Sequence, residues 1–444
     1  MTETQVKVIA GLDSIGGNIV VLEKDNYQIV TDFGIIRGTT DSEALDLAMT
    51  SDLVDRKGLP QLDGLYPQKQ LKAKTVEAYE TSQKQTIICI SHLHLDHIGA
   101  LLHLAPQIPV YTSQESYDFY QALAQTGFLP DYQVNWQGVA YDEVLEHGPF
   151  KIQFKASDHD TKGIAAIFIE SPDLKVIHSG DFRYSGFHPE KVFAWGQAAR
   201  QFEADLALLE GTTFSFLPDP NQAPVPLEPW QEKIKVIESK TELSLLKNIS
   251  QLLEANPQAS VVFNGYEQNL ERLLYLSQVL SQLGRQLALD EKYYQLALSF
   301  AKIYGLKYDN ICLADLPLIK KKPQNYVLNL TYDHYQDMFE LPAGLYLHSN
   351  GYPLGPYMPA YQPFVLDLQA HNWQMYQMGS SGHAYPQDLL NQAYLVNAKV
   401  TVPWHSSQPD LYAQGLSSQG LKVWRPIPYQ TYSASQIKAL KEDA

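Results

Sequence analysis

The chain has 444 residues, of which 45% are hydrophobic, and this is enough apolar material for one large core or two ordinary ones. Its formal net charge of −16 argues against a protein whose whole surface attracts polyanions, although a local channel can still bind nucleic acid. Two cysteines, an N-terminus without a basic-then-apolar segment, and no apolar window of about eighteen residues favour a cytoplasmic protein without a membrane span.

The first half of the chain predicts strands that alternate with turns and helices. Residues 17–23 and 27–31 have the pattern of a hairpin, and the apolar run 86–90 has that of a buried strand. Residues 34–79 carry few clean periodic signals, so their structure is left open. Helices are expected at residues 113–126 and 188–202. Further strands are expected at residues 108–112, 151–156, 164–170, 175–178 and 206–209.

The second half predicts a separate compact body. A proline-rich passage at residues 216–230 is typical of a crossing between domains. Beyond it, the alternation of helical and strand patterns is typical of a parallel α/β unit, and the passage 352–363 is expected to lead back. The helices are expected at residues 232–255, 268–283 and 292–303, with strands at 260–264 and 286–289. We therefore expect a mixed α/β (α+β) fold with a core at residues 1–220 and 366–444 and an inserted body at residues 221–365.

The most informative segment is SHLHLDH, at residues 91–97, directly after a predicted strand. His92 and His94 can point toward one ion, while Asp96 and His97 can point toward a second ion beside it. Imidazole and carboxylate ligands suit zinc or a similar first-row metal, and two adjacent ions indicate hydrolysis. The alternative is a solvated histidine turn, but a chance histidine tract rarely carries an aspartate and a preceding core strand as well.

Other candidate ligands also follow predicted strands. His159 lies in SDHDTKG, Asp181 lies in HSGDFR, and His405 follows the apolar run 400–404. The two oxygens of Asp181 can bridge two cations. A single histidine at a strand end is usually structural, but the order and placement of these residues predict that they join the SHLHLDH site. His178, on the strand before Asp181, is expected to be a packed or supporting group.

The series Asp32, SHLHLDH, His159 and Asp181 resembles the metallo-β-lactamase superfamily. LLEGTTF with Glu210, SSGHA with His383 and TVPWH with His405 resemble the three motifs of its β-CASP branch, and residues 263–289 resemble the inserted β-CASP domain. The resemblance covers most of the chain and is strongest to the ribonuclease J group, which processes RNA as an endonuclease and 5′-to-3′ exonuclease. It implies a four-layer αββα sandwich with an inserted α/β domain.

The resemblance also implies roles for individual residues. Two Zn²⁺ ions are expected, with Mn²⁺ as an alternative; Asp181 would bridge them. Asp32 and Glu210 would support the ligands by hydrogen bonding, and His383 would lie over the scissile phosphate. Asp96, Asp181 and His383 are the expected catalytic residues. One ion would be held by His92, His94 and His159, and the other by Asp96, His97 and His405.

A phosphate site is expected beside His383. The backbone N–H groups of Ser380, Ser381 and Gly382 could hold a phosphate, because glycine permits close approach. The alternative is an ordinary Ser-Gly turn before a helix at residues 386–393.

The sequence departs from the family at three places. Phe33 separates Asp32 from Gly34 where the family usually has a small residue, and Gly163 follows His159 after only four positions. The chain also ends soon after His405, without a counterpart of the C-terminal domain of ribonuclease J, so a homodimer is only one of the expected assemblies.

We therefore expect a zinc-dependent phosphodiester hydrolase that acts on single-stranded RNA. A DNA nuclease of the same branch, a hydrolase of small esters or lactones, and a non-catalytic nucleic-acid-binding subunit are the alternatives. Histidine at position 405 resembles the RNA-processing members of the branch, whereas the DNA-processing members have valine there.

Overall fold

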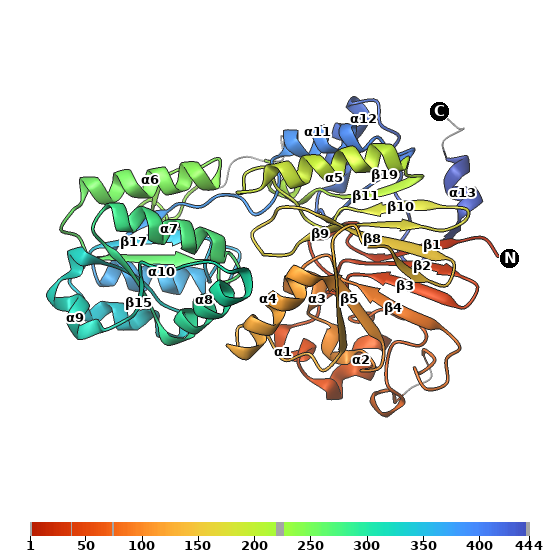
Figure 1. The fold of residues 1–444 in the computed structure, drawn as a ribbon, viewed down its shortest axis with the longest axis horizontal. Helices are drawn as coiled ribbons and strands as arrows, with labels where there is room; N and C mark the ends of the chain where they lie inside the picture. Colours follow the sequence, from red (N-terminus) through yellow and green to blue (C-terminus); the bar gives the residue numbers. More distant parts are fainter. Residues whose placement is uncertain (1, 37, 73–74, 219–225, 441–444) are drawn as a thin grey trace.

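The computed structural model describes residues 2–36, 38–72, 75–218 and 226–440, so the expected boundary at residues 220 and 221 lies outside the described residues. Two facing sheets with helices on their outer sides form the core, and a third sheet with its own helices forms a second body beside them (Figure 1). Among the described helices, none combines the length and the apolar character that crossing a bilayer requires.

The first sheet has the strand order β20-β1-β2-β3-β4-β5-β6. The expected hairpin is present, because β2 and β3 pair antiparallel with Val20 opposite Thr31. From β3 to β6 the pairing is parallel, so the loops after these strands emerge at one edge. The strands are β1 (Gln5–Ala10), β2 (Ile19–Lys24), β3 (Tyr27–Thr31), β4 (Gln85–Cys89), β5 (Pro109–Ser113), β6 (Asn135–Val139) and β20 (Thr431–Ser433).

The second sheet has the order β19-β11-β10-β9-β8-β7. Its inner face packs on the inner face of the first sheet: Val20 and Ile29 share one buried apolar cluster with Ile167 and Leu208. Side chains alternate between the two faces of each strand, so one face fills this cluster and the other meets helices. The strands are β7 (Leu145–His147), β8 (Phe150–Ala156), β9 (Ala165–Glu170), β10 (Lys175–His178), β11 (Leu206–Glu210) and β19 (Val400–Trp404).

Helices cover the outer face of each sheet, which completes four layers. The second sheet meets α5, α11 and α12; Phe168 and Leu209 pack there with Trp195, Leu389 and Tyr412. The first sheet is covered by α2, α3 and α4, where Leu53, Ile98 and Phe119 pack with Val30 and Ile88. The segment 34–79 that the sequence left open contributes α1 and α2. The helices are α1 (Asp41–Ala44), α2 (Thr50–Asp55), α3 (Leu95–Ile98), α4 (Gln114–Gln125), α5 (Pro189–Phe202), α11 (Pro386–Val396), α12 (Pro409–Ser418) and α13 (Ala434–Ala439).

The second body contains a sheet of order β12-β18-β17-β13-β16-β14-β15, in which every recorded pairing is parallel. Its strands are β12 (Lys235–Val236), β13 (Val261–Gly265), β14 (Gln286–Leu289), β15 (Ile311–Leu313), β16 (Tyr326–Asn329), β17 (Leu345–Ser349) and β18 (Gln374–Gln377). Its helices are α6 (Glu242–Ala255), α7 (Leu270–Gln282), α8 (Glu291–Tyr304), α9 (Leu316–Lys321) and α10 (Tyr361–Ala370).

Two sequence predictions for this body were wrong. The helix expected from residue 232 begins at Glu242, because Thr241 caps it in a capping box with Ser244 and the preceding residues include β12. The passage 352–363 does not lead back to the core, since α10 and β18 follow it within the same body. We therefore propose that the second body extends through Gln377, beyond the expected limit at residue 365.

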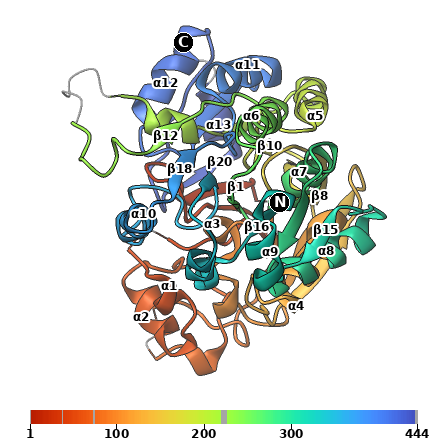
Figure 2. The same cartoon turned by 90° about the vertical axis from the view of Figure 1, so that its left-hand side faces the viewer.

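The second body packs directly on the core. Figure 2 views the molecule from the side of the second body, with α8 lying next to α4 of the core. The rings of Phe119 on α4 and Phe300 on α8 lie 5.3 Å apart, edge to face. One buried apolar cluster contains side chains of both bodies, so the two have a continuous apolar contact.

Candidate metal centre

The loop after β4 carries four predicted site residues at the carboxyl edge of the first sheet. Asp32, directly after β3, accepts hydrogen bonds from the N–H (2.7 Å) and the hydroxyl (3.0 Å) of Ser91. It also lies 2.8 Å from Nδ1 of His97 and 3.5 Å from Nε2 of His178. Asp32 thus fixes the start of the loop and the ring orientation of His97, the kind of support that a metal-binding imidazole needs. The four residues are His92, His94, Asp96 and His97.

Phe33 and Gly34 explain the departure from the family pattern. The Phe33 N–H donates to the carbonyl of His97 (2.7 Å), and its ring is fully buried in the core. A Cβ on Gly34 would lie 1.6 Å from the carbonyl oxygen of Asp96, so no larger residue fits beside the histidine loop. The small residue is therefore needed at position 34, and Phe33 anchors the segment from the apolar side.

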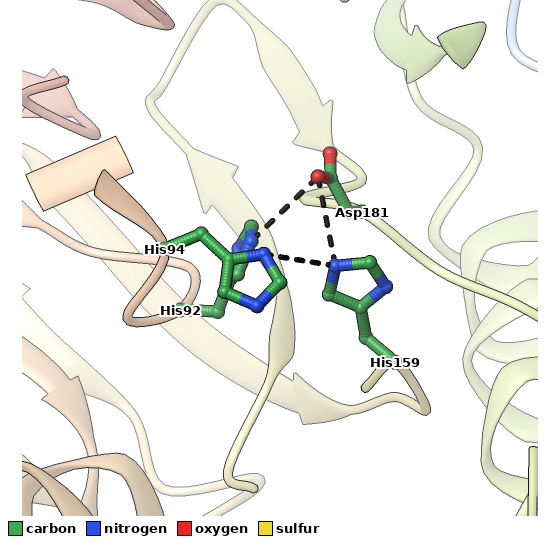
Figure 3. A group of neighbouring side chains, drawn as sticks. All are labelled: His92, His94, His159 and Asp181. Atoms are coloured by element: carbon green, nitrogen blue, oxygen red, sulfur yellow. Dashed lines mark hydrogen bonds and ion pairs between the residues drawn. The ribbon is translucent and has the colours of Figure 1, made fainter. Parts of the chain in front are cut away.

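A first pocket brings together His92, His94, His159 and Asp181, which offer ligand atoms within 4.8 Å of one another (Figure 3). Nε2 of His159 lies 3.2 Å from Nδ1 of His94, and Nε2 of His92 lies 3.6 Å from Oδ2 of Asp181. The other ring nitrogen of His159, Nδ1, contacts the carbonyl of Gly382. Since that carbonyl can only accept, Nδ1 carries the hydrogen and Nε2 presents a lone pair to the pocket.

A second pocket brings together Asp96, His97, Asp181 and His405 within the same limit. Nε2 of His405 lies 2.9 Å from Oδ2 of Asp96, and Nε2 of His97 lies 3.4 Å from Oδ2 of Asp181. The hydroxyl of Thr212 lies 2.6 Å from Nδ1 of His405 and turns its Nε2 toward Asp96. Asp181 is therefore common to both pockets, and its Oδ2 lies within 3.9 Å of ring nitrogens of His92, His97 and His159.

Glu210 and His383 form a third group with Asp181 and His405. Glu210 is fully buried, accepts from the N–H groups of Phe182 (3.2 Å) and Thr212 (2.9 Å), and lies 3.4 Å from Nδ1 of His383. Burial alone lowers the pKa of His383, but the carboxylates of Glu210 and Asp181 outweigh it and raise that pKa to about 9. His383 is therefore a cationic hydrogen-bond donor at neutral pH.

The donor atoms of the two pockets fit a divalent cation. Among the described residues, three of these atoms are buried without any hydrogen-bond partner: Nε2 of His92 and both oxygens of Asp181. Buried polar atoms are normally paired, and such a gathering of unpaired ones indicates an ion or ordered water between them. Three imidazoles in one pocket, and imidazole with carboxylate in the other, suit Zn²⁺ or Mn²⁺.

Burial and neighbouring charges shift the pKa values of the pocket residues in different directions. Burial lowers the pKa of His92 and of His94, so both rings are neutral and able to bind metal. Burial raises the pKa of Asp181, but His405 and His97 outweigh it and hold that pKa well below its ordinary value. Burial also lowers the pKa of His97, yet Asp96, Asp181 and Asp32 together raise it well above its ordinary value.

The loop that contains Ser380, Ser381 and Gly382 lies beside His383 with its carbonyls held by the protein. The Ser380 carbonyl accepts from Arg272 (3.3 Å) and the Ser381 carbonyl from the hydroxyl of Ser185 (3.0 Å). The N–H groups of the three residues have no backbone acceptor among the described residues. A cavity of about 530 Å³ borders Ser380 and Ser381. The loop can therefore offer N–H groups to an anion.

A buried ion cluster ties this loop to the second body. Glu242, the first residue of α6, accepts from Arg183 (2.7 Å) and from two nitrogens of Arg272 (2.8 Å each). All three side chains are at most 1% exposed. Arg183 comes from the core, two residues after Asp181, and Arg272 comes from α7. The cluster therefore fixes how the second body lies against the site.

Gln268, before α7, makes a second connection. Its side-chain oxygen accepts from the Thr161 hydroxyl (2.8 Å), and its amide donates to the Leu93 carbonyl (3.3 Å). Leu93 lies between His92 and His94, while Thr161 follows His159 on the facing loop. Gln268 thus links the two loops that form the first pocket.

The structure brings every predicted ligand into one of the two pockets and places Asp32, Glu210 and His383 against them. Sequence reasoning missed three features: Asp160, Thr212, and the cluster of Arg183, Glu242 and Arg272. Asp160 was visible next to His159 in SDHDTKG, but nothing in the sequence tells which way its carboxylate points. The cluster joins distant segments and has no local signal.

A family model described as "Beta-lactamase superfamily domain" matches residues 60–221, the part of the core that contains all but one of the pocket residues. This segment is similar to the β-lactamase superfamily domain. A solved structure titled as a protein of unknown function from Enterococcus faecalis V583 has the same fold: the TM-score is 0.77, with 23% identity over 97% of this chain and 100% of the other.

Curated proteins that resemble the chain are named ribonuclease J. The one from Mycoplasma pneumoniae is 22% identical over 335 residues, which is 74% of this chain and 51% of that protein. The one from Pyrococcus abyssi is 22% identical over 193 residues, or 42% of this chain and 39% of that protein. The chain thus spans about half the length of the first of these relatives.

Proposed function

We propose that this protein is a metal-dependent phosphodiester hydrolase that cleaves single-stranded RNA with the help of two Zn²⁺ or Mn²⁺ ions. The observation that carries the proposal is that Asp181, whose two buried oxygens have no hydrogen-bond partner among the described residues, is shared by two groups of histidine and aspartate ligand atoms. The similarity to proteins named ribonuclease J supports RNA as the substrate, as does the histidine at position 405.

In this proposal Asp181, which both pockets share, would be a ligand common to the two ions. When bound, the pair of divalent cations would lower the pKa of a water molecule and neutralise charge on the phosphate oxygens. Asp32 and Glu210 would keep the ligands oriented through the hydrogen bonds described above. The ligands would be His92, His94 and His159 for one ion and Asp96, His97 and His405 for the other.

The remaining steps belong to the protein's own side chains. Asp96 and Asp181 would orient the attacking water, whose in-line attack on phosphorus breaks the P–O3′ bond and leaves a 5′-phosphate and a 3′-hydroxyl. His383, whose Nδ1 lies 3.4 Å from Glu210, would donate to the phosphate or to the departing 3′ oxygen. The N–H groups of the loop at residues 380–382 would hold the phosphate.

The test compares 5′-phosphorylated single-stranded RNA, DNA of the same sequence and a small ester, each with and without Zn²⁺ or Mn²⁺. We expect metal-dependent cleavage of the RNA and much less turnover of the other two. Cleavage of the ester alone would contradict the proposal, and DNA cleavage equal to RNA cleavage would favour the DNA nuclease alternative.

Two substitutions separate metal binding from catalysis. Asp181→Ala should lose bound metal, as measured by elemental analysis of the purified protein. His383→Ala should keep its metal while kcat falls by about 100-fold or more, the usual range for loss of an acid catalyst. His334→Ala, at an exposed histidine of the second body, is the matched control and should change neither quantity.

A further inference from the structure

Asp160 has no role in the proposed function, yet its carboxylate lies against the first pocket. It follows His159 on the loop between β8 and β9. Its Oδ1 lies 3.4 Å from Nε2 of His94 and 3.3 Å from Nε2 of His159. This oxygen is buried and has no hydrogen-bond partner among the described residues. An isolated buried carboxylate is costly, so its position calls for a positively polarised neighbour.

The tautomers of His94 and His159 show which of the two rings presents an N–H group to Asp160. His159 carries its hydrogen on Nδ1, where it contacts the Gly382 carbonyl, so its Nε2 has no hydrogen for Asp160. His94 has the opposite arrangement, because its Nδ1 lies 3.2 Å from Nε2 of His159 and faces the pocket. An imidazole that binds a cation through Nδ1 carries its hydrogen on Nε2, and the nearest carboxylate to that nitrogen is Asp160.

The second carboxylate oxygen of Asp160, Oδ2, lies close to Gly382. A Cβ added to Gly382 would lie 2.6 Å from Oδ2 of Asp160. The absence of a side chain at Gly382 therefore leaves room for the carboxylate between His94 and the loop at residues 380–383. The glycine of SSGHA thus serves the first pocket as well as the loop itself.

The position of Asp160 also affects how negative charge is divided between the two pockets. Asp181 is shared, and the second pocket has a carboxylate of its own in Asp96. Without Asp160, the first pocket would have only three neutral imidazoles and the shared Asp181. With Asp160 nearby, each pocket has one carboxylate of its own beside the common one, which favours occupation of both by divalent cations.

We propose that Asp160 is a positioning residue for His94: its carboxylate, 3.4 Å from Nε2, attracts the hydrogen on that nitrogen, keeps Nδ1 toward the first pocket, and adds negative charge beside the ion there. This inference rests on the proposed metal centre. It predicts that Asp160 controls the affinity of the first pocket and leaves that of the second unchanged.

The experiment measures Zn²⁺ affinity and stoichiometry by competition with a chromophoric chelator for the wild type, Asp160→Ala and Asp160→Asn. Loss of a carboxylate that orients a metal-bound histidine weakens binding by about 10- to 100-fold. We expect Asp160→Ala to show this loss for one of two ions, and Asp160→Asn, which keeps an acceptor oxygen, to show a smaller one. Histidine ¹⁵N NMR should show that the Nε2–H tautomer of one ring is lost in Asp160→Ala.

The matched control is Asp158→Asn, on the same loop. Its carboxylate accepts from the N–H of His188 (3.0 Å) and is not paired with His94. Unchanged affinity for both ions in Asp160→Ala, or an equal loss in Asp158→Asn, would overturn the inference while leaving the metal centre intact. A wild-type protein that binds no Zn²⁺ or Mn²⁺ would instead overturn the proposed function itself.

Discussion

The substitution Glu242→Gln tests the buried ion cluster between the core and the second body. It leaves Arg183 and Arg272 charged, buried and without their carboxylate partner. Removing one partner of a buried ion pair costs about 3–5 kcal/mol. Burial raises the pKa of Glu242, but Arg272 and Arg183 outweigh it and lower that pKa from its ordinary value of 4.5 to about 2. Through linkage, this difference corresponds to about 3 kcal/mol of stability near pH 7, so we expect a loss of about 3 kcal/mol.

The contribution of Glu242 to the free energy of unfolding depends on pH in a direction that can be worked out from its pKa. Because the folded-state pKa of Glu242 is lowered, its contribution is fully present above pH 4.5 and is lost as the pH falls toward 2. The difference between the wild type and Glu242→Gln should therefore be greatest near neutral pH and shrink below pH 4.5.

The assay is urea unfolding followed by tryptophan fluorescence at several pH values. Glu254→Gln, at an exposed position of the same helix, is the control and should stay within about 0.5 kcal/mol of the wild type. If Glu242→Gln lowers the free energy of unfolding by less than about 1 kcal/mol, or by an amount that does not depend on pH, the ion cluster does not stabilise the fold.

Three further predictions concern the site. Gly34→Ala should abolish stable metal binding, because its Cβ would lie 1.6 Å from the Asp96 carbonyl oxygen; normal metal content would refute this. Gln268→Ala should lower the free energy of unfolding by about 1–3 kcal/mol, since it leaves the Leu93 carbonyl and the Thr161 hydroxyl without a partner; an unchanged thermal unfolding midpoint would contradict it. EDTA should lower the unfolding midpoint of the wild type and excess Zn²⁺ should restore it, as ligand at about 1,000 times its Kd adds about 4 kcal/mol. Asp181→Ala should not respond to either reagent, and an equal response would argue against a site centred on that residue.

The convergence of the pocket residues could be predicted because each follows a strand with a clear apolar pattern. Parallel strands end at one edge of a sheet, so order and spacing alone suggested that His159, Asp181 and His405 approach the loop at residues 91–97. The strand β1 was missed, although QVKVIA alternates, and β6 has too few apolar residues to be detected.

Other features depend on contacts that no local pattern encodes. The start of α6 was misplaced because polar residues at 232–240 fit a helical pattern as well as they fit β12 and the capping box. The meeting of Arg183 with Arg272 follows from the docking of the second body, and the direction of the Asp160 carboxylate follows from its place between His94 and the loop at residues 380–383. The residues that end strands could therefore be predicted from the sequence, whereas contacts between distant segments could not.

The position of His405 along the chain has a consequence for biosynthesis. The other pocket residues, from His92 to Asp181, leave the ribosome before the second body is made, whereas His405 on β19 follows it. A nascent chain can therefore gather the residues of the first pocket early but cannot complete the second pocket until β19 has been translated. Under the proposed function, the growing polypeptide therefore carries an incomplete two-ion centre until β19 has been translated.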